Sequence, residues 1–250
     1  MNDGINGTAF LEGQPNFRGF DGLVTKDGKR FRKGLVYRSG NLDGLNASDL
    51  RKLEKIGLAL VIDFRTDREI KSHPSPAIST VKETLRITIP DAALEPAMGF
   101  LEKNDANGLE KVLVSDYRRM IRDDSPAFRE FFRILEQTSE YPFVYHCAAG
   151  KDRTGIASVL FLTALGADEE MVRKDYFLSN ERLKEYANKV VLTINGSGRN
   201  GEIIRPMMEV RPEYLHAAYD EIERSFGGME NYLANVLHTN IDLLKSKYLE

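Results

Sequence analysis

The feature that most constrains the fold of this chain is the stretch of residues 141–165. Residues 143–145 are apolar and aromatic and predict a buried strand, whereas residues 156–165 are almost wholly apolar and predict a helix. Small residues, 148–150, lie between the two. A strand that feeds a helix through a tight loop directs several backbone N–H groups at one point, beside the positive end of the helix dipole. The stretch therefore predicts an anion-binding loop.

Two reactive side chains bound this loop. Cys147 stands at its base and Arg153 at its far end, with five residues between them. This spacing lets the loop wrap around a tetrahedral dianion, so that thiolate, amides and guanidinium converge on one phosphorus atom. The planar fork of Arg can hold two phosphate oxygens at once. The expected phosphate-binding residues are Ala148, Ala149, Gly150, Lys151, Asp152 and Arg153.

The spacing His-Cys-x-x-Gly-x-x-Arg-Thr in residues 146–154 is similar to the signature of the cysteine-dependent protein tyrosine phosphatase superfamily. The chain resembles in particular a bacterial branch whose loop reads His-Cys-x-x-Gly-Lys-Asp-Arg-Thr-Gly. Some members of that branch are called triple-specificity phosphatases because they act on phosphotyrosine, phosphoserine or phosphothreonine, and phosphoinositides. Residues 16–18, 34–40, 61–65 and 228–233 also look like that branch, so the resemblance covers most of the chain.

The resemblance implies an enzyme that hydrolyses phosphate monoesters through a cysteinyl-phosphate intermediate. The expected substrate is phosphotyrosine in proteins, with phosphoserine or phosphothreonine as an extension. A phosphoinositide phosphatase and a non-catalytic phosphate-binding module are the alternatives. A sulfurtransferase would not need the Arg153-Thr154 end of the loop, and an arsenate reductase would need more cysteines than the one present.

Within this chemistry each loop residue has an expected role. Cys147 is the nucleophile, and the helix N-terminus, the loop amides and Arg153 all favour its thiolate form. Arg153 stabilises the trigonal transition state. The hydroxyl of Thr154 can donate to the sulfur when it leaves in the second step. His146 is expected to order the loop through hydrogen bonds.

The departing oxygen also needs a proton donor. In most of the superfamily an Asp on a separate upstream loop supplies the proton, and Asp91, just after a predicted strand, is placed for that role. Asp152 lies inside the anion loop itself, and the related branch is thought to use this in-loop Asp. We favour Asp152 as the acid and keep Asp91 as the alternative.

The remaining pattern predicts one α/β domain over residues 1–250, with a mostly parallel central sheet flanked by helices. Strands are expected at residues 58–64 and 85–89, a hairpin over residues 16–40, and a helix over residues 47–56 capped by Asn46. Thr66 and Glu69 have capping-box spacing. Ser125 is the expected N-cap of a helix whose core face holds four apolar side chains, Phe128, Phe131, Phe132 and Leu135.

Two further parts of the chain are expected to be helical. Residues 92–124 are amphipathic and either form a solvated hairpin or a lid over the site; some members of the branch carry a helical lid there, so we expect a lid. The C-terminal part should be helical over residues 168–190 and from about Pro212 and Met229 onward. Residues 195–202 are rich in Gly and Asn and are expected to be mobile.

Bulk properties exclude several classes of protein. The net charge of −3 and the pI near 5.9 argue against a general nucleic-acid binder. No apolar run approaches the ~20 residues of a membrane span. The four histidines show no ligand-like clustering, so neither a metal nor another cofactor is expected. The single Cys suits a reducing compartment, and no secretory signal opens the sequence. The expected location is the cytoplasm, or export without a cleavable signal.

Overall fold

In the computed structural model, which describes residues 11–250, β5 (Phe143–His146) is the middle strand of a five-stranded sheet. The strand order is β1-β2-β5-β3-β4. β2 (Val36–Ser39) and β3 (Leu60–Asp63) flank β5 in parallel, and β4 (Glu83–Arg86) runs parallel to β3. β1 (Arg18–Gly19) is antiparallel to β2. The predicted hairpin and mostly parallel sheet are confirmed.

Successive side chains of each strand point to opposite faces of the sheet, so the apolar side chains form two cores. Phe143 and Tyr145 of β5 join the larger cluster, whereas Val144 points to the other face. Val144 is in register with Tyr37 of β2 and Val61 of β3, and all three belong to the smaller cluster. The middle strand is therefore buried on both faces, as expected for a parallel sheet.

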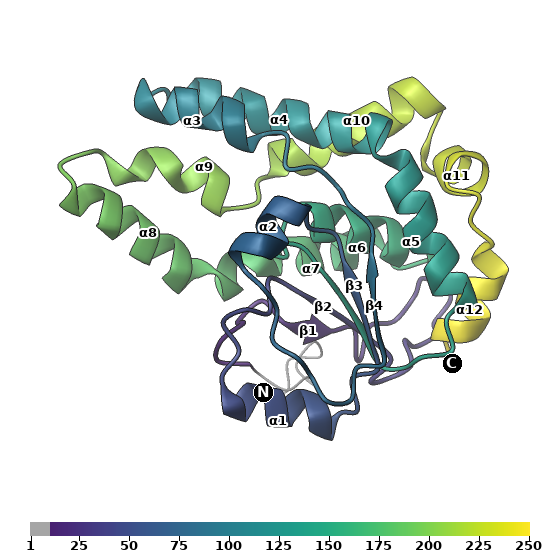
Figure 1. Cartoon of the computed structure of the whole chain (residues 1–250). Coiled ribbons are helices and arrows are strands. Elements are labelled where there is room, and N and C mark those ends of the chain that lie inside the picture. Colours follow the sequence, from purple (N-terminus) through teal and green to yellow (C-terminus); the bar gives the residue numbers. More distant parts are fainter. Residues whose placement is uncertain (1–10) are drawn as a thin grey trace.

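Helices cover the two faces unequally (Figure 1). α1 (Ala47–Lys55) packs Leu53 into the smaller core, on the opposite side of the sheet from the other main helices. The larger core receives side chains from α5 (Ser125–Gln137), α6 (Arg153–Ala164), α7 (Glu169–Arg182) and α10 (Pro212–Phe226). The four apolar residues predicted for the core face of α5 are all fully buried.

The insertion forms α3 (Leu94–Glu102) and α4 (Ala106–Asp123). α4 packs along α10, where the rings of Tyr117 and Tyr214 lie 5.4 Å apart. The lid role of residues 92–124 stays a prediction.

The remaining helical elements are α2 (Asp67–Ser72), α8 (Lys184–Gly196), the 3-10 helix Gly201–Ile204, α9 (Arg205–Met208), α11 (Met229–Asn231), the π-helical turn Tyr232–Val236 and α12 (Ile241–Tyr248). No helix within residues 11–250 is long and apolar enough to cross a membrane.

Several predicted boundaries were wrong. β4 ends at Arg86, although the N–H of Ile87 still donates to the carbonyl of Asp63 at 2.9 Å and that of Ile89 to the carbonyl of Phe64 at 3.0 Å. α5 begins at Ser125, with Asp124 rather than Ser125 as its N-cap. The helix after the anion loop begins at Arg153, three residues earlier than expected. Residues 168–190 were predicted as one helix, but the chain turns at Leu183 and continues as α8. The helix predicted from Met229 ends at Val236, and the chain becomes helical again at Ile241 as α12.

Candidate active site

The anion loop lies where β5 meets α6, at the C-terminal edge of the sheet, and Cys147 is only 2% exposed. Because β5 is the middle strand, this loop opens at the centre of that edge. Asp152 is the N-cap of α6, but among the described residues its side chain makes no capping hydrogen bond to the helix. The N–H groups of the first turn of α6 are therefore available to an anion.

Two donor groups hold three carbonyl groups of the loop. The N–H of Asn41 donates to the carbonyl of Ala148 at 2.7 Å, and Asn16 Nδ2 donates to those of Ala149 and Gly150 at 2.9 and 3.0 Å. Because these carbonyl groups point away from the centre of the loop, the N–H groups of the same peptide units point toward it. The loop is thus prepared as a nest of N–H groups before any phosphate arrives.

A buried ion-pair network supports the same loop. Arg38 Nη2 donates to the carbonyl of Gly150 at 2.7 Å, and its Nη1 bonds to Asp175. Arg18 Nε also bonds to Asp175, at 2.8 Å. All three side chains are at most 2% exposed. Burial opposes the ionised form of Asp175, but the two guanidinium groups hold the pKa of its carboxyl below the usual value.

The loop also depends on a glycine at Gly150. Its φ is +70°, in the left-handed region, and a Cβ there would lie 2.3 Å from the carbonyl oxygen of Ser39. No side chain can therefore be accommodated without moving either β2 or the loop. The predicted signature glycine is required by both backbone conformation and close packing.

Arg153 is held from outside the loop by Glu69. Its Nη2 lies 2.5 Å from Oε1 of Glu69 and its Nη1 lies 2.9 Å from Oε2, while Nη1 also donates to the carbonyl of Ile89 at 3.1 Å. Burial disfavours the charged guanidinium, yet the negative charges of Cys147 and Glu69 raise the pKa of Arg153. Cys147 and Arg153 therefore lie within electrostatic reach of each other.

These contacts leave one edge of the guanidinium for a ligand. Within residues 11–250, Nε–H and the second N–H of Nη2 have no protein acceptor. The two groups point in the same direction and form a fork that matches two phosphate oxygens. Glu69 thereby fixes which edge of Arg153 faces the loop.

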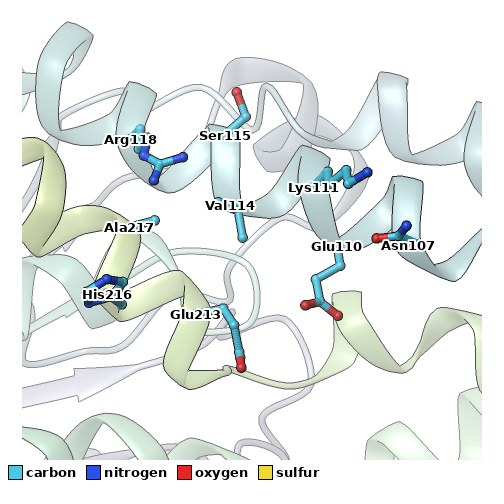
Figure 2. A pocket seen from close by; sticks show the side chains of 9 residues that line it. All are labelled: Asn107, Glu110, Lys111, Val114, Ser115, Arg118, Glu213, His216 and Ala217. Carbon is cyan, nitrogen blue, oxygen red and sulfur yellow. The ribbon is translucent and has the colours of Figure 1, made fainter.

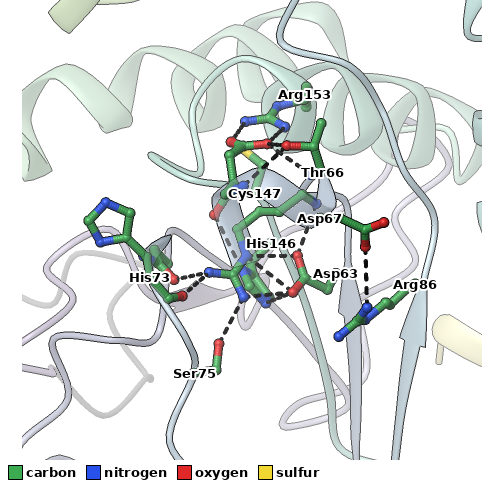
Figure 3. A network of polar contacts seen from close by, with 12 residues as sticks. Asp63, Thr66, Asp67, His73, Ser75, Arg86, His146, Cys147 and Arg153 are labelled. Atoms are coloured by element: carbon green, nitrogen blue, oxygen red, sulfur yellow. Dashed lines mark hydrogen bonds and ion pairs between the residues drawn. The ribbon is translucent and has the colours of Figure 1, made fainter. Parts of the chain in front are cut away.

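The capping box of α2 explains how Glu69 is positioned. Thr66 donates its N–H and its hydroxyl to Oε2 of Glu69, both at 2.9 Å, so the carboxylate folds back over the N-terminus of the helix. Figure 3 shows Arg153 beside Thr66 and above Cys147. The sequence predicted the capping box but not its second use as a support for Arg153.

Asp152 is held by two different groups. Lys151 Nζ lies 2.9 Å from Oδ1 and 2.7 Å from Oδ2, and the hydroxyl of Tyr117 donates to Oδ1 at 2.7 Å. Lys151 is only 5% exposed, so it is not a solvated side chain. It neutralises the carboxylate next to it.

Asp91, the alternative acid, also lies near the site. Burial raises the pKa of its carboxyl, and so do the negative charges of Asp152 and Glu69, while Arg153 and Lys151 oppose the rise. The structure therefore brings both candidate acids within electrostatic reach of Arg153. The two acids differ in their hydrogen-bond partners, because Asp152 bonds directly to a lysine and a tyrosine.

His146 and Thr154 are fully buried on either side of the thiol. Nδ1 of His146 lies 3.2 Å from the carbonyl oxygen of Cys147, and burial lowers the pKa of His146 to about 4, so the ring is neutral and can order the loop. Figure 3 shows it beside Asp63. The hydroxyl of Thr154 has no hydrogen-bond partner among the described residues, so the expected bond to the sulfur is not formed in this state.

Sequence patterns did not identify the supporting residues of the site. Asn16, Arg38 and Glu69 lie in stretches that had been singled out, but without a role at the loop. Tyr117 belongs to the amphipathic pattern of residues 92–124, which indicated a helix but no contact with the loop. Asp175 gave no signal, because a lone polar residue in a predicted helix is ordinary. Each acts through a contact between residues at least 35 positions apart, which local patterns cannot show.

The rest of the described structure offers a surface hollow but no metal site. Residues 11–250 contain no group of three His, Cys, Asp or Glu side chains placed to hold a metal. A hollow of about 440 Å³ lies between α4 and α10, with Glu110, Lys111, Arg118, Glu213 and His216 on its walls. Figure 2 shows these side chains, and no residue of the anion loop lines the hollow.

Comparison with known proteins gives the following matches. Residues 9–250 match the family described as the tyrosine phosphatase family. A protein of Cupriavidus necator named "putative tyrosine-protein phosphatase" is 31% identical, over 94% of this chain and 85% of that one. "Triple specificity protein phosphatase PtpB" of Mycobacterium tuberculosis is 25% identical, over 89% and 91% of the two chains. Crystalline TpbA of P. aeruginosa in complex with phosphotyrosine has a TM-score of only 0.31, with 14% identity over 88% of each chain.

Proposed function

This chain belongs to the tyrosine phosphatase family, and we propose that Cys147, Arg153 and Asp152 carry out its reaction, the hydrolysis of phosphotyrosine in proteins. Membership of the family confirms the enzyme class predicted from the loop, a protein-tyrosine-phosphatase. One observation supports the residue roles most strongly: a buried thiol and the free fork of Arg153 meet at the N-terminus of α6.

In the first step the thiolate of Cys147 attacks phosphorus in line with the ester oxygen. The S–P bond forms as the P–O bond breaks, and the electron pair of that bond passes to the tyrosine oxygen. Asp152 delivers a proton to this oxygen, while Arg153 and the loop amides hold the non-bridging oxygens. In the second step water attacks phosphorus and gives its proton to Asp152. The S–P electron pair returns to the sulfur, where Thr154 can then donate.

The two candidate acids can be separated by their effect on the leaving group. If Asp152 is the donor, Asp152→Asn lowers the rate on phenyl phosphate at least ~100-fold and the rate on dinitrophenyl phosphate much less, because the activated phenol departs without a proton. Asp91→Asn then changes both rates little. The reverse pattern would move the acid to Asp91, which its raised pKa would suit.

Substrate class is tested by comparing phosphopeptides with lipids. A relative bears the name of a triple specificity phosphatase, so phosphoserine, phosphothreonine and phosphoinositide substrates belong in the same assay. The ammonium group of Lys151, which could otherwise contact a second phosphate, is already paired with Asp152. We therefore expect kcat/KM to be highest on phosphotyrosine peptides. A faster reaction on a phosphoinositide would instead favour the lipid alternative, and no turnover of any phosphate monoester would leave a phosphate-binding module.

A further inference from the structure

A chain of hydroxyl groups reaches the anion loop from two helices. The hydroxyl of Tyr176, on α7, donates to the oxygen of Tyr117 at 2.9 Å. The hydroxyl of Tyr117, on α4, donates in turn to Oδ1 of Asp152 at 2.7 Å. Both tyrosines are at most 1% exposed, so water does not compete for these bonds. The chain runs in one direction, from α7 through the insertion to the loop.

The surroundings keep each tyrosine a donor. Burial raises the pKa of Tyr117 and of Tyr176 well above the usual value, and the negative charge of Asp152 adds to this effect. Tyr176 is also fixed in place, because its ring packs directly against Gly155 in the first turn of α6, where an added Cβ would lie 3.2 Å away. Because Tyr176 occupies the oxygen of Tyr117, the hydrogen of Tyr117 is left to point at Asp152.

This arrangement distinguishes the two oxygens of Asp152. A carboxyl group carries its proton on one oxygen, and an oxygen that accepts from Tyr117 cannot at the same time present that lone pair to a proton. Oδ1 receives both Tyr117 and Lys151, whereas Oδ2 receives Lys151 alone. Lys151 contacts both oxygens, so the bond from Tyr117 is what makes Oδ1 differ from Oδ2.

We propose that Tyr117 is a positioning residue for the reaction, which holds Asp152 by Oδ1 so that Oδ2 carries the proton and delivers it to the leaving oxygen. The inference rests on the role of Asp152 given under Proposed function. It assigns the insertion a task in the reaction, since α4 supplies the group that orients the acid. Tyr176 supports this task by fixing the direction of the Tyr117 hydroxyl.

The test is Tyr117→Phe, which removes the hydroxyl and keeps the ring against Tyr214. We expect the rate on phenyl phosphate to fall at least ~10-fold, with KM unchanged and the rate on dinitrophenyl phosphate within about twofold of wild type, because only a poor leaving group needs the proton. The matched control is Tyr214→Phe, which removes another buried hydroxyl from the same cluster, one that bonds to the carbonyl of Pro206. It should leave the leaving-group dependence unchanged.

Two double variants test whether the effect on rate arises from proton transfer rather than from altered folding. Tyr117→Phe combined with Tyr176→Phe leaves no orphaned hydroxyl and should show the same leaving-group dependence as Tyr117→Phe alone. In an Asp152→Asn background, Tyr117→Phe should have no further effect, because it acts only through Asp152. Equal slowing of both substrates, or a full effect in the Asp152→Asn background, would overturn the proposal.

The same data separate this inference from the one on which it rests. If Asp152→Asn shows the leaving-group dependence and Tyr117→Phe does not, Asp152 remains the acid and the role of Tyr117 is wrong. If neither variant shows the dependence, the assignment of Asp152 fails and the role of Tyr117 fails with it.

Discussion

Glu69 holds Arg153 by two contacts, with Oε1 2.5 Å from Nη2 and Oε2 2.9 Å from Nη1. The carboxylate comes from the first turn of α2 and the guanidinium from the first turn of α6. Although burial favours its neutral form, the bonds from Arg153 lower the pKa of Glu69 below the usual value, so it stays ionised. In the proposed mechanism the pair leaves the opposite edge of Arg153 for the phosphate.

Glu69→Gln should therefore lower kcat/KM about 100-fold, because a displaced guanidinium no longer matches the transition state. Steady-state kinetics on a phosphotyrosine peptide measure this loss. The control is Asp67→Asn, on the same helix, whose side chain is 94% exposed and pairs with Arg86 at the surface. Wild-type activity in Glu69→Gln would show that the loop alone orients Arg153.

Asp175→Asn should destabilise the protein by about 3–5 kcal/mol, since it leaves two buried guanidinium groups without their shared carboxylate. Urea denaturation at neutral pH gives the free energy of unfolding. Glu202→Gln is the control, because that carboxylate is 58% exposed in its pair with Arg205 and should change stability by less than about 1 kcal/mol. Equal stability of the two variants would contradict a structural role for Asp175.

Asp116 should make stability depend on pH. Burial and the negative charges of Asp91 and Asp152 raise the pKa of its carboxyl to about 6, although Arg119 opposes the rise. The folded state then binds the proton more tightly than the unfolded state, so this stabilisation is present below about pH 4 and is lost as pH rises through 6. Asp116→Asn removes the titration.

Urea unfolding of both proteins from pH 4 to pH 7 tests this directly. We expect the stability of wild type relative to Asp116→Asn to fall by up to about 3 kcal/mol over that range. The expected direction is a relative loss for wild type as pH rises. A constant difference, or one that grows in favour of wild type, would show that Asp116 does not titrate as its surroundings indicate.

The reacting groups could be predicted from the sequence because they lie on one continuous loop. The spacing of Cys147, Gly150 and Arg153 places them around one anion whatever the rest of the fold does. The strand before the loop and the helix after it could also be predicted, because an uninterrupted apolar run is typical of a buried strand or helix. The capping box at Thr66 was predicted for the same reason, as a purely local pattern.

The residues that support the loop could not be predicted, because their contacts depend on which strands and helices become neighbours. Asn16 reaches Ala149 only because β1 pairs with β2 and β2 lies beside β5. Tyr117 reaches Asp152 only because α4 crosses near the start of α6. Element boundaries failed for a related reason: the break at Leu183 follows from how α8 leaves the core, and no glycine or proline marks it in the sequence.

The most direct test of the account is to find the phosphoryl group on the protein. Rapid quenching during turnover of a phosphotyrosine peptide, followed by mass spectrometry of the digest, should locate one phosphoryl group on the peptide that contains Cys147. Cys147→Ser, which removes the thiolate, should show no such adduct and should lose at least ~10⁴-fold in kcat. Turnover without any phosphorylated intermediate, or a phosphoryl group on another residue, would contradict the assignment of Cys147 as the nucleophile.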